Sequence, residues 1–78
     1  MTKKKIDECI RDSLNDYFRD MAGEEPHGMY DMLLNVVEKP LLDVVMQRAG
    51  QNQSRAAEWL GLNRNTLRKK LLEHKLVK

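Results

Sequence analysis

Residues 53–71 read QSRAAEWLGLNRNTLRKKL and contain two short apolar patterns separated by one glycine. Apolar residues at helical spacing lie on both sides of the glycine: Ala56, Ala57 and Leu60 before it, and Leu62, Leu67 and Leu71 after it. Gly61 can adopt a positive φ without the steric cost of a Cβ atom, so it suits a tight turn after a helix. The pattern therefore predicts two short helices joined at Gly61, and the small side chain of Ala57 lets them approach closely.

The outer face of the second of these helices is basic and rich in amides. It carries Arg64, Asn65, Arg68 and Lys69, with Lys70 at its flank and Asn63 at the start of the helix. No acidic residue occurs from residue 60 to residue 72. Two helices with this spacing resemble the helix-turn-helix of DNA-binding proteins, whose second helix enters the major groove. A basic amphipathic helix alone is often only solvated surface, but the register of the small and apolar residues around Gly61 favours DNA binding.

The distribution of charge along the chain also favours a polyanionic partner. The chain has 78 residues, which suffices for one small domain but is marginal for an independent core. Residues 1–50 contain seven Lys or Arg and ten Asp or Glu, a net charge of −3. Residues 51–78 contain seven Lys or Arg and two Glu, a net charge of +5. A basic end on an acidic body is expected when only one end of a protein binds a polyanion.

The sequence carries no pattern typical of an enzyme. Cys9 is the only cysteine, which excludes an intramolecular disulfide and disfavours a zinc site. His27 and His74 have no Ser, Cys or metal-ligand partner at a workable spacing. We therefore expect no catalytic residue, metal site, cofactor or small-molecule substrate. No apolar run is long enough to span a membrane and no secretory signal follows Met1, so we expect a cytoplasmic protein without membrane association.

A first long helix is predicted from about residue 6 to residue 21, after a short flexible segment of residues 1–5. Its apolar stripe repeats at spacings of three and four and consists of Ile6, Cys9, Ile10, Leu14, Tyr17, Phe18 and Met21. Cys9 belongs to this stripe, so we interpret it as a small buried hydrophobic residue. Gly23, Pro26 and Gly28 mark the loop that follows.

A second long helix is predicted from residue 29 to residue 48, with apolar residues on more than one side. Its main stripe consists of Met29, Met32, Leu33, Val36, Val37, Leu41, Val44 and Val45. Pro40 lies inside this pattern, so we expect a kink rather than a helix end. A short chain has little with which to cover so broad a face, and we expect two chains to pair residues 1–50 in an intertwined four-helix core. The alternative is that this helix contacts only the other helices of its own chain.

Segments around Pro40 and Gly61 resemble a known family. Residues 38–46 read EKPLLDVVM, and later segments read NQSRAA at 52–57, GLNR at 61–64 and TLRKKL at 66–71. They are similar to Fis, the bacterial factor for inversion stimulation, and less closely to the C-terminal domain of NtrC-type activators. The resemblance covers nearly all of the chain from Ile6 onward. It implies an all-α homodimer with four helices per chain, in which residues 1–50 form the dimerisation core and residues 51–78 the helix-turn-helix.

The resemblance also implies which residues contact DNA. The base-reading pair of the family falls on Asn63 and Arg64, and an arginine can bind guanine O6 and N7 through two hydrogen bonds. Asn63 has a rival role as the N-cap of its helix and could serve both. Positions that contact the DNA backbone fall on Asn52, Gln53, Ser54, Thr66, Arg68, Lys69 and Lys70. Asn65 joins this set through its place on the polar face, and Asn52 is also predicted to cap its helix by accepting from a backbone N–H near Arg55.

Fis-like proteins bind and bend DNA, act on the nucleoid, and regulate transcription and site-specific recombination. The implied partners are double-stranded DNA and a second copy of the chain, with RNA polymerase or a recombinase as further partners. The two recognition helices of such dimers lie closer together than one turn of straight DNA, so DNA shape contributes much of the sequence preference. Two alternatives stay open: a protein-interaction module whose basic helix binds an acidic partner, and the DNA-binding output domain of an NtrC-type activator.

The chain departs from the family pattern at three places. Only residues 1–5 precede the first predicted helix, where family members often carry an arm that contacts DNA invertases, so stimulation of inversion is not expected. Leu72 and Glu73 stand where enterobacterial relatives have lysines, which reduces the basic flank. Trp59 is larger than the usual residue at its position, and we expect it to cover the junction between the C-terminal helices and the dimer core.

Overall fold

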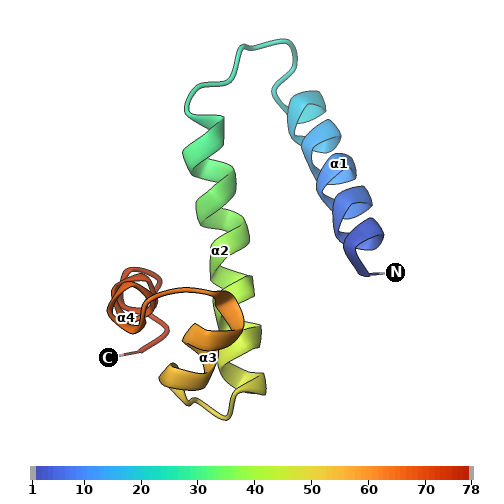
Figure 1. The fold of residues 1–78 in the computed structure, drawn as a ribbon. Helices are drawn as coiled ribbons and strands as arrows, with labels where there is room; N and C mark the ends of the chain where they lie inside the picture. The colour runs from blue at the N-terminus through green and yellow to red at the C-terminus, as the bar shows by residue number, and fades with distance from the viewer. Residues whose placement is uncertain (1, 78) are drawn as a thin grey trace.

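The computed structural model describes residues 2–77 as four α-helices, and this part of the chain contains no strand (Figure 1). The helices are α1 (Thr2–Asp20), α2 (Met29–Arg48), α3 (Gln53–Leu60) and α4 (Arg64–Glu73). The all-α class with four helices, predicted from the sequence, is confirmed. Helices α1 and α2 run antiparallel and diverge from a loop at one end, while α3 and α4 pack beside the other end of α2.

Helix α1 begins earlier than the sequence predicted. Its first residue is Thr2 rather than Ile6, so residues 2–5, which we expected to be flexible, belong to the helix. Consecutive lysines have good helix propensity and nothing in this segment breaks a helix, which explains the earlier start. The first turn consequently contains no acidic residue to complement the helix dipole. Ion pairs between Arg11 and Asp7 and between Arg19 and Asp16 lie on the exposed surface of the helix.

Helix α2 runs without interruption through Pro40. It starts after Gly28, which has a φ of 62° and accepts a hydrogen bond from the N–H of Met32 at 3.1 Å. Proline cannot donate to the carbonyl of Val36 one turn earlier. Val36 is 60 % exposed, so water can reach that side of the helix. The helix therefore tolerates the proline, and the prediction that residue 40 would not end it is confirmed.

The buried core lies where the C-terminal half of α2 meets α3 and α4. Its members are apolar or small: Leu42, Met46, Ala49, Ala56, Ala57, Leu67 and Leu71. Partly buried side chains pack around them, namely Val45, Leu60, Leu62, Leu76 and Val77. The two alanines of α3 let the helices approach closely, and leucines of α4 fill the space between them. This core fixes the position of α4.

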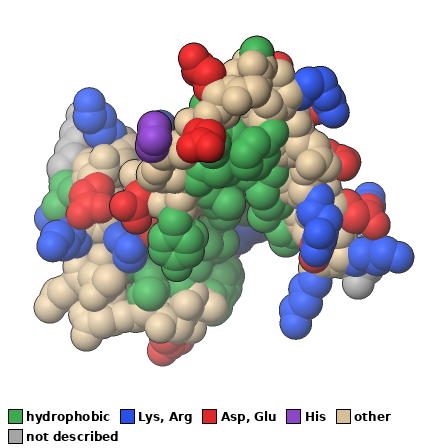
Figure 2. All heavy atoms as spheres, turned by 90° about the horizontal axis from the view of Figure 1, so that it is seen from above, with side chains coloured by type: hydrophobic (Ala, Val, Ile, Leu, Met, Phe, Trp, Pro, Cys, Tyr) green, Lys and Arg blue, Asp and Glu red, His purple; other side chains and the backbone are tan. Residues whose placement is uncertain are grey.

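Helix α1 and the N-terminal half of α2 leave their apolar side chains largely uncovered. Ile6 is 59 % exposed, and Phe18, Leu34 and Val36 are also exposed. Figure 2 shows hydrophobic side chains gathered in the middle of the face seen from above, with charged side chains to either side. Cys9 is exposed as well, so the prediction that it would be buried is wrong for the single chain. Ile10, Leu14, Tyr17 and Met21 of the same stripe are half-buried, so the chain covers this stripe only in part.

Candidate nucleic-acid interface

The turn between α3 and α4 is built as the sequence predicted. Gly61 adopts a φ of 71° and its N–H donates to the carbonyls of Ala57 and Glu58. The N–H of Leu62 donates to the carbonyl of Ala57 at 3.0 Å. These bonds satisfy carbonyls that the end of α3 would otherwise leave without partners. The glycine thus ends α3 and directs the chain into the residues that start α4.

Asparagine side chains cap the starts of both helices. The Asn52 carbonyl oxygen accepts from the N–H of Arg55 at 3.1 Å, which confirms the predicted cap of α3. The Asn63 carbonyl oxygen accepts from the N–H of Asn65 at 2.8 Å, so this residue does cap α4. Capping occupies only the carbonyl oxygen of each amide. The amide NH₂ of Asn63 still has two donor hydrogens with which it can bind another group.

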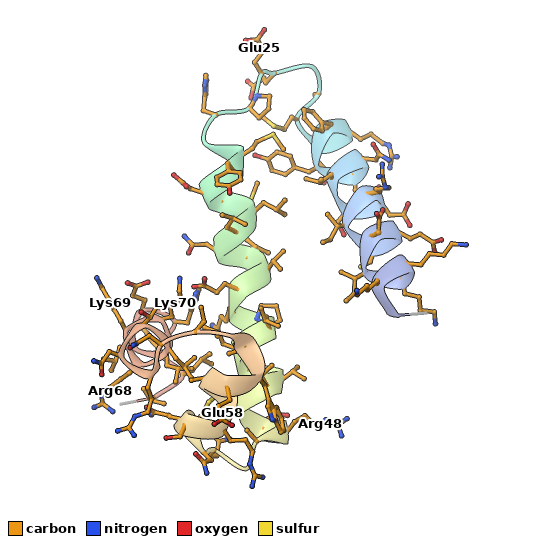
Figure 3. The ribbon with its side chains drawn as sticks, viewed as in Figure 1. Glu25, Arg48, Glu58, Arg68, Lys69 and Lys70 are labelled. Atoms are coloured by element: carbon orange, nitrogen blue, oxygen red, sulfur yellow. The ribbon has the colours of Figure 1, made fainter. Side chains whose placement is uncertain are left out.

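Helix α4 presents its polar residues outward while two leucines anchor it. Leu67 and Leu71 are fully buried. The exposed residues of its outer side are Arg64, Asn65, Thr66, Arg68 and Lys69. Figure 3 shows Arg68 and Lys69 projecting from the side of α4 that faces away from α2. The same figure places Glu58 on α3, below this group of cations.

The starts of α3 and α4 come together through their side chains. Arg64 Nη1 donates to Ser54 Oγ at 3.3 Å, although the two residues are ten positions apart. Ser54 is exposed and Gln53 is half-buried at the first turn of α3. The structure therefore brings Asn52, Gln53 and Ser54 close to the start of α4. The sequence predicted both groups separately and did not predict the Arg64–Ser54 contact.

Lys70 differs from its cationic neighbours because it is paired within the chain. Its Nζ lies 3.0 Å from Oε2 of Glu38 on α2. The other carboxylate oxygen, Oε1, lies 2.8 Å from Nε2 of His74, the C-cap residue directly after α4. All three side chains are largely shielded from solvent: 32 % of Lys70, 25 % of Glu38 and 11 % of His74 is exposed. Hydrogen bonds from Lys70 and His74 hold the pKa of the Glu38 carboxyl below its ordinary value.

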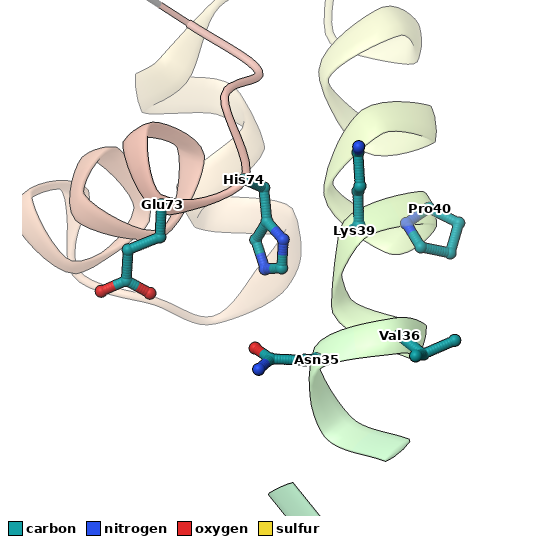
Figure 4. A pocket seen from close by; sticks show the side chains of 6 residues that line it. All are labelled: Asn35, Val36, Lys39, Pro40, Glu73 and His74. Carbon is teal, nitrogen blue, oxygen red and sulfur yellow. The ribbon is translucent and has the colours of Figure 1, made fainter. Parts of the chain in front are cut away.

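Sequence reasoning missed this group of three side chains. Glu38 is 32 residues from Lys70 and 36 residues from His74, so no local spacing relates them. His74 had no evident partner in the sequence, and its exposure of only 11 % is explained by its contact with α2. Figure 4 shows the His74 ring reaching from the end of α4 toward α2, across a cleft of about 570 Å³ that Asn35, Lys39 and Glu73 also line.

The described residues lack two structural features. They contain no cluster of His, Cys, Asp or Glu arranged to hold a metal ion. No helix between residues 2 and 77 combines the length and apolar character needed to cross a membrane. Trp59 is 56 % exposed in the single chain, and its expected cover of the junction with the dimer core stays a prediction. Arg64, Arg68 and Lys69 are exposed on α4, so its outer side is cationic.

Two short helices joined at a left-handed glycine, the second with a cationic outer side, define a helix-turn-helix protein. Residues 33–74 match the Fis family of bacterial regulatory proteins. The chain belongs to the Fis family. Regulators of this family are not enzymes, which agrees with the expectation that the chain has no catalytic residue.

Relatives of the chain match over almost its whole length. A Fis-like DNA-binding protein of Ralstonia nicotianae is 56 % identical over 77 residues, which cover 99 % of this chain and 100 % of the relative. One of Neisseria meningitidis is 58 % identical over 76 residues, 97 % of this chain and 96 % of the relative. The DNA-binding protein Fis of Proteus mirabilis is 42 % identical over 74 residues, 95 % of this chain and 76 % of that protein.

Proposed function

We propose that the chain forms a homodimer that binds and bends double-stranded DNA. The cationic outer side of α4, held in place by a dedicated core, is the observation that carries the DNA-binding part of the proposal. Membership of the Fis family and relatives described as DNA-binding proteins support it. Helix α4 would enter the major groove, as the second helix of a helix-turn-helix does.

The contacts proposed on α4 divide into base reading and backbone binding. Arg64 reads a guanine edge with two hydrogen bonds, and the NH₂ of Asn63, left free by capping, binds a base next to it. Phosphate contacts come from the start of α3 and from the outer side of α4: Asn52, Gln53, Ser54, Thr66, Arg68 and Lys69. Asn65 lies among them on the exposed side of α4. These contacts supply most of the affinity and make it depend on salt.

The homodimer is proposed because apolar side chains of α1 and α2 remain exposed to solvent in the single chain. A groove of about 300 Å³ runs between the two helices and is lined by Ile6, Cys9, Ile10, Ser13, Leu33, Val36, Val37 and Pro40. Seven of these eight side chains are apolar, and several are exposed in the single chain. A second copy presents the same surface, so a two-fold arrangement can cover both grooves at once. In that arrangement Cys9 becomes buried.

Bending follows from how the dimer would hold its two α4 helices. If residues 1–50 of two chains form one rigid core, they fix the separation of the recognition helices. The family places them closer than successive major grooves of straight DNA, so the DNA must curve to meet both. Such a protein would act at many sites on the nucleoid as a regulator of transcription or recombination. RNA polymerase or a recombinase would then be its protein partner.

A gel-shift assay on circularly permuted fragments, with the mass of the complex measured in parallel, tests the proposal. The proposed function predicts two chains per duplex and a mobility that varies with the position of the site. A single chain per duplex, or mobility independent of site position, would contradict the homodimer or the bending respectively. Negligible DNA affinity together with selective binding of an acidic protein would instead identify a protein-interaction module.

A further inference from the structure

Lys70 lies beside the side of α4 that is proposed to bind DNA, but its ammonium contacts an acidic residue of another helix. It lies one helical turn after Thr66, so the two side chains share a flank of α4. Thr66 is exposed and belongs to the proposed phosphate contacts. Lys70 Nζ, however, lies 3.0 Å from Glu38 Oε2 of α2. The ammonium that could extend the phosphate-binding row is thus engaged inside the chain.

We infer that Glu38 sets the DNA affinity of the protein by competing with a DNA phosphate for Lys70. This inference rests on the proposed DNA binding. A carboxylate and a phosphate oxygen accept from the same ammonium, and a lysine carries its charge on a flexible four-carbon stem. About a third of the Lys70 side chain is exposed, so a phosphate can reach it without unfolding of the helix. For Lys70 to contact a phosphate, its ammonium must therefore exchange the Glu38 carboxylate for a phosphate oxygen.

His74 makes the exchange feasible because it gives Glu38 a second partner. After Lys70 leaves, the carboxylate retains the contact of 2.8 Å between its Oε1 and Nε2 of His74. It is therefore not left without a hydrogen bond in a place where only a quarter of its side chain meets solvent. Lys39 and Glu73 line the adjoining cleft, one of each charge, and neither forms an ion pair with this group among residues 2–77.

A double-mutant cycle on a random-sequence duplex tests the competition. The four proteins are the wild type, Glu38→Gln, Lys70→Gln and the double variant, each checked for helical circular dichroism. An unrestrained phosphate contact steepens the salt slope by about 0.9 for each protomer, which is up to about eightfold in affinity per protomer at 0.1 M salt relative to 1 M salt. We expect Glu38→Gln to tighten binding by several-fold. We expect Lys70→Gln to weaken binding much more in the Glu38→Gln background than in the wild type.

The matched control is Glu73→Gln, which removes an acidic charge from α4 itself without removing a partner of Lys70. In the Glu73→Gln background, Lys70→Gln should lower DNA affinity by the same factor as in the wild type. The competition is wrong if Glu38→Gln leaves affinity unchanged or lowers it, or if Lys70→Gln costs the same in all backgrounds. The absence of salt-dependent duplex binding by the wild type would refute the proposed function itself, and is distinguishable from these results.

A measurement on the carboxyl group separates competition from a merely structural contact. The side-chain carboxyl of Glu38 can be titrated by carbon NMR with and without the duplex. Competition predicts that the duplex moves this titration to higher pH in the wild type by more than in Lys70→Gln, because only the wild-type carboxylate loses a lysine that stabilises its charged form, while the negative field of the duplex acts on both. A titration that the duplex moves no further in the wild type than in Lys70→Gln would overturn the inference.

Discussion

Leu67→Ala is the substitution that most directly tests how α4 is held. The Leu67 side chain is fully buried, and it is one of only seven residues in the core of the described chain. Removing it leaves a cavity, and buried Leu→Ala changes cost about 3–5 kcal/mol. A chain of 78 residues has a total stability on the order of 4–12 kcal/mol, so the loss takes a large part of it. The variant should unfold at much lower urea concentration and bind DNA more weakly, because α4 loses its anchor.

The control for Leu67→Ala is Leu72→Ala, five residues later on the same helix. Leu72 is about half exposed, so its truncation should cost about 1 kcal/mol or less. Urea unfolding followed by circular dichroism compares the two variants at one fixed protein concentration, because dimerisation makes stability depend on concentration. Similar losses in both variants would refute the position of the core between α2, α3 and α4.

Three further predictions concern the interface and its supports. Arg64→Ala should cost about 1–3 kcal/mol of binding at preferred sites and less on random DNA, measured by competition gel shift; equal losses on both would rule out base reading. Gly61→Ala should lower the free energy of unfolding by about 1 kcal/mol through backbone strain alone, since a Cβ there meets nothing within 4 Å. Gly61→Asn should lower it less, because asparagine adopts a left-handed conformation more readily than alanine. Equal stability of the wild type and both variants would contradict the left-handed turn. Because the pKa of Glu38 is lower in the folded chain than its ordinary value of 4.5, the stability it contributes is present above that pH and is lost as the pH falls through the folded-state value. Acid unfolding of Glu38→Gln should therefore depend less on pH below about 4.5 than that of the wild type, and identical pH profiles would show that the pairing contributes no stability.

The helix-turn-helix could be predicted from the sequence because its turn, its caps and its apolar face each depend on residues that are close together in the chain. Gly61 has the positive φ that a helix end followed at once by another helix requires. Asn52 and Asn63 cap their helices because amide oxygens accept from backbone N–H groups two or three positions on. The apolar spacing likewise located Leu67 and Leu71 on the inner side of α4. The contacts of the helix-turn-helix with DNA are proposed above.

Features that depend on distant residues were not predictable in the same way. The pairing of Glu38 with Lys70 and His74 joins two helices whose relative position no periodicity encodes. Cys9 has the spacing of a buried residue, but burial also needs close packing by another element, and Cys9 stays exposed beside the groove between α1 and α2. The start of α1 was placed too late because a run of lysines was interpreted as a flexible segment rather than as helix.

The central proposal is that two copies join through α1 and α2 and so fix the separation of two α4 helices. Sedimentation equilibrium of the full chain at micromolar concentration, alone and with a duplex, tests it most directly. We predict a mass of two chains in both samples. A folded species with the mass of one chain, free and on DNA, would contradict the account.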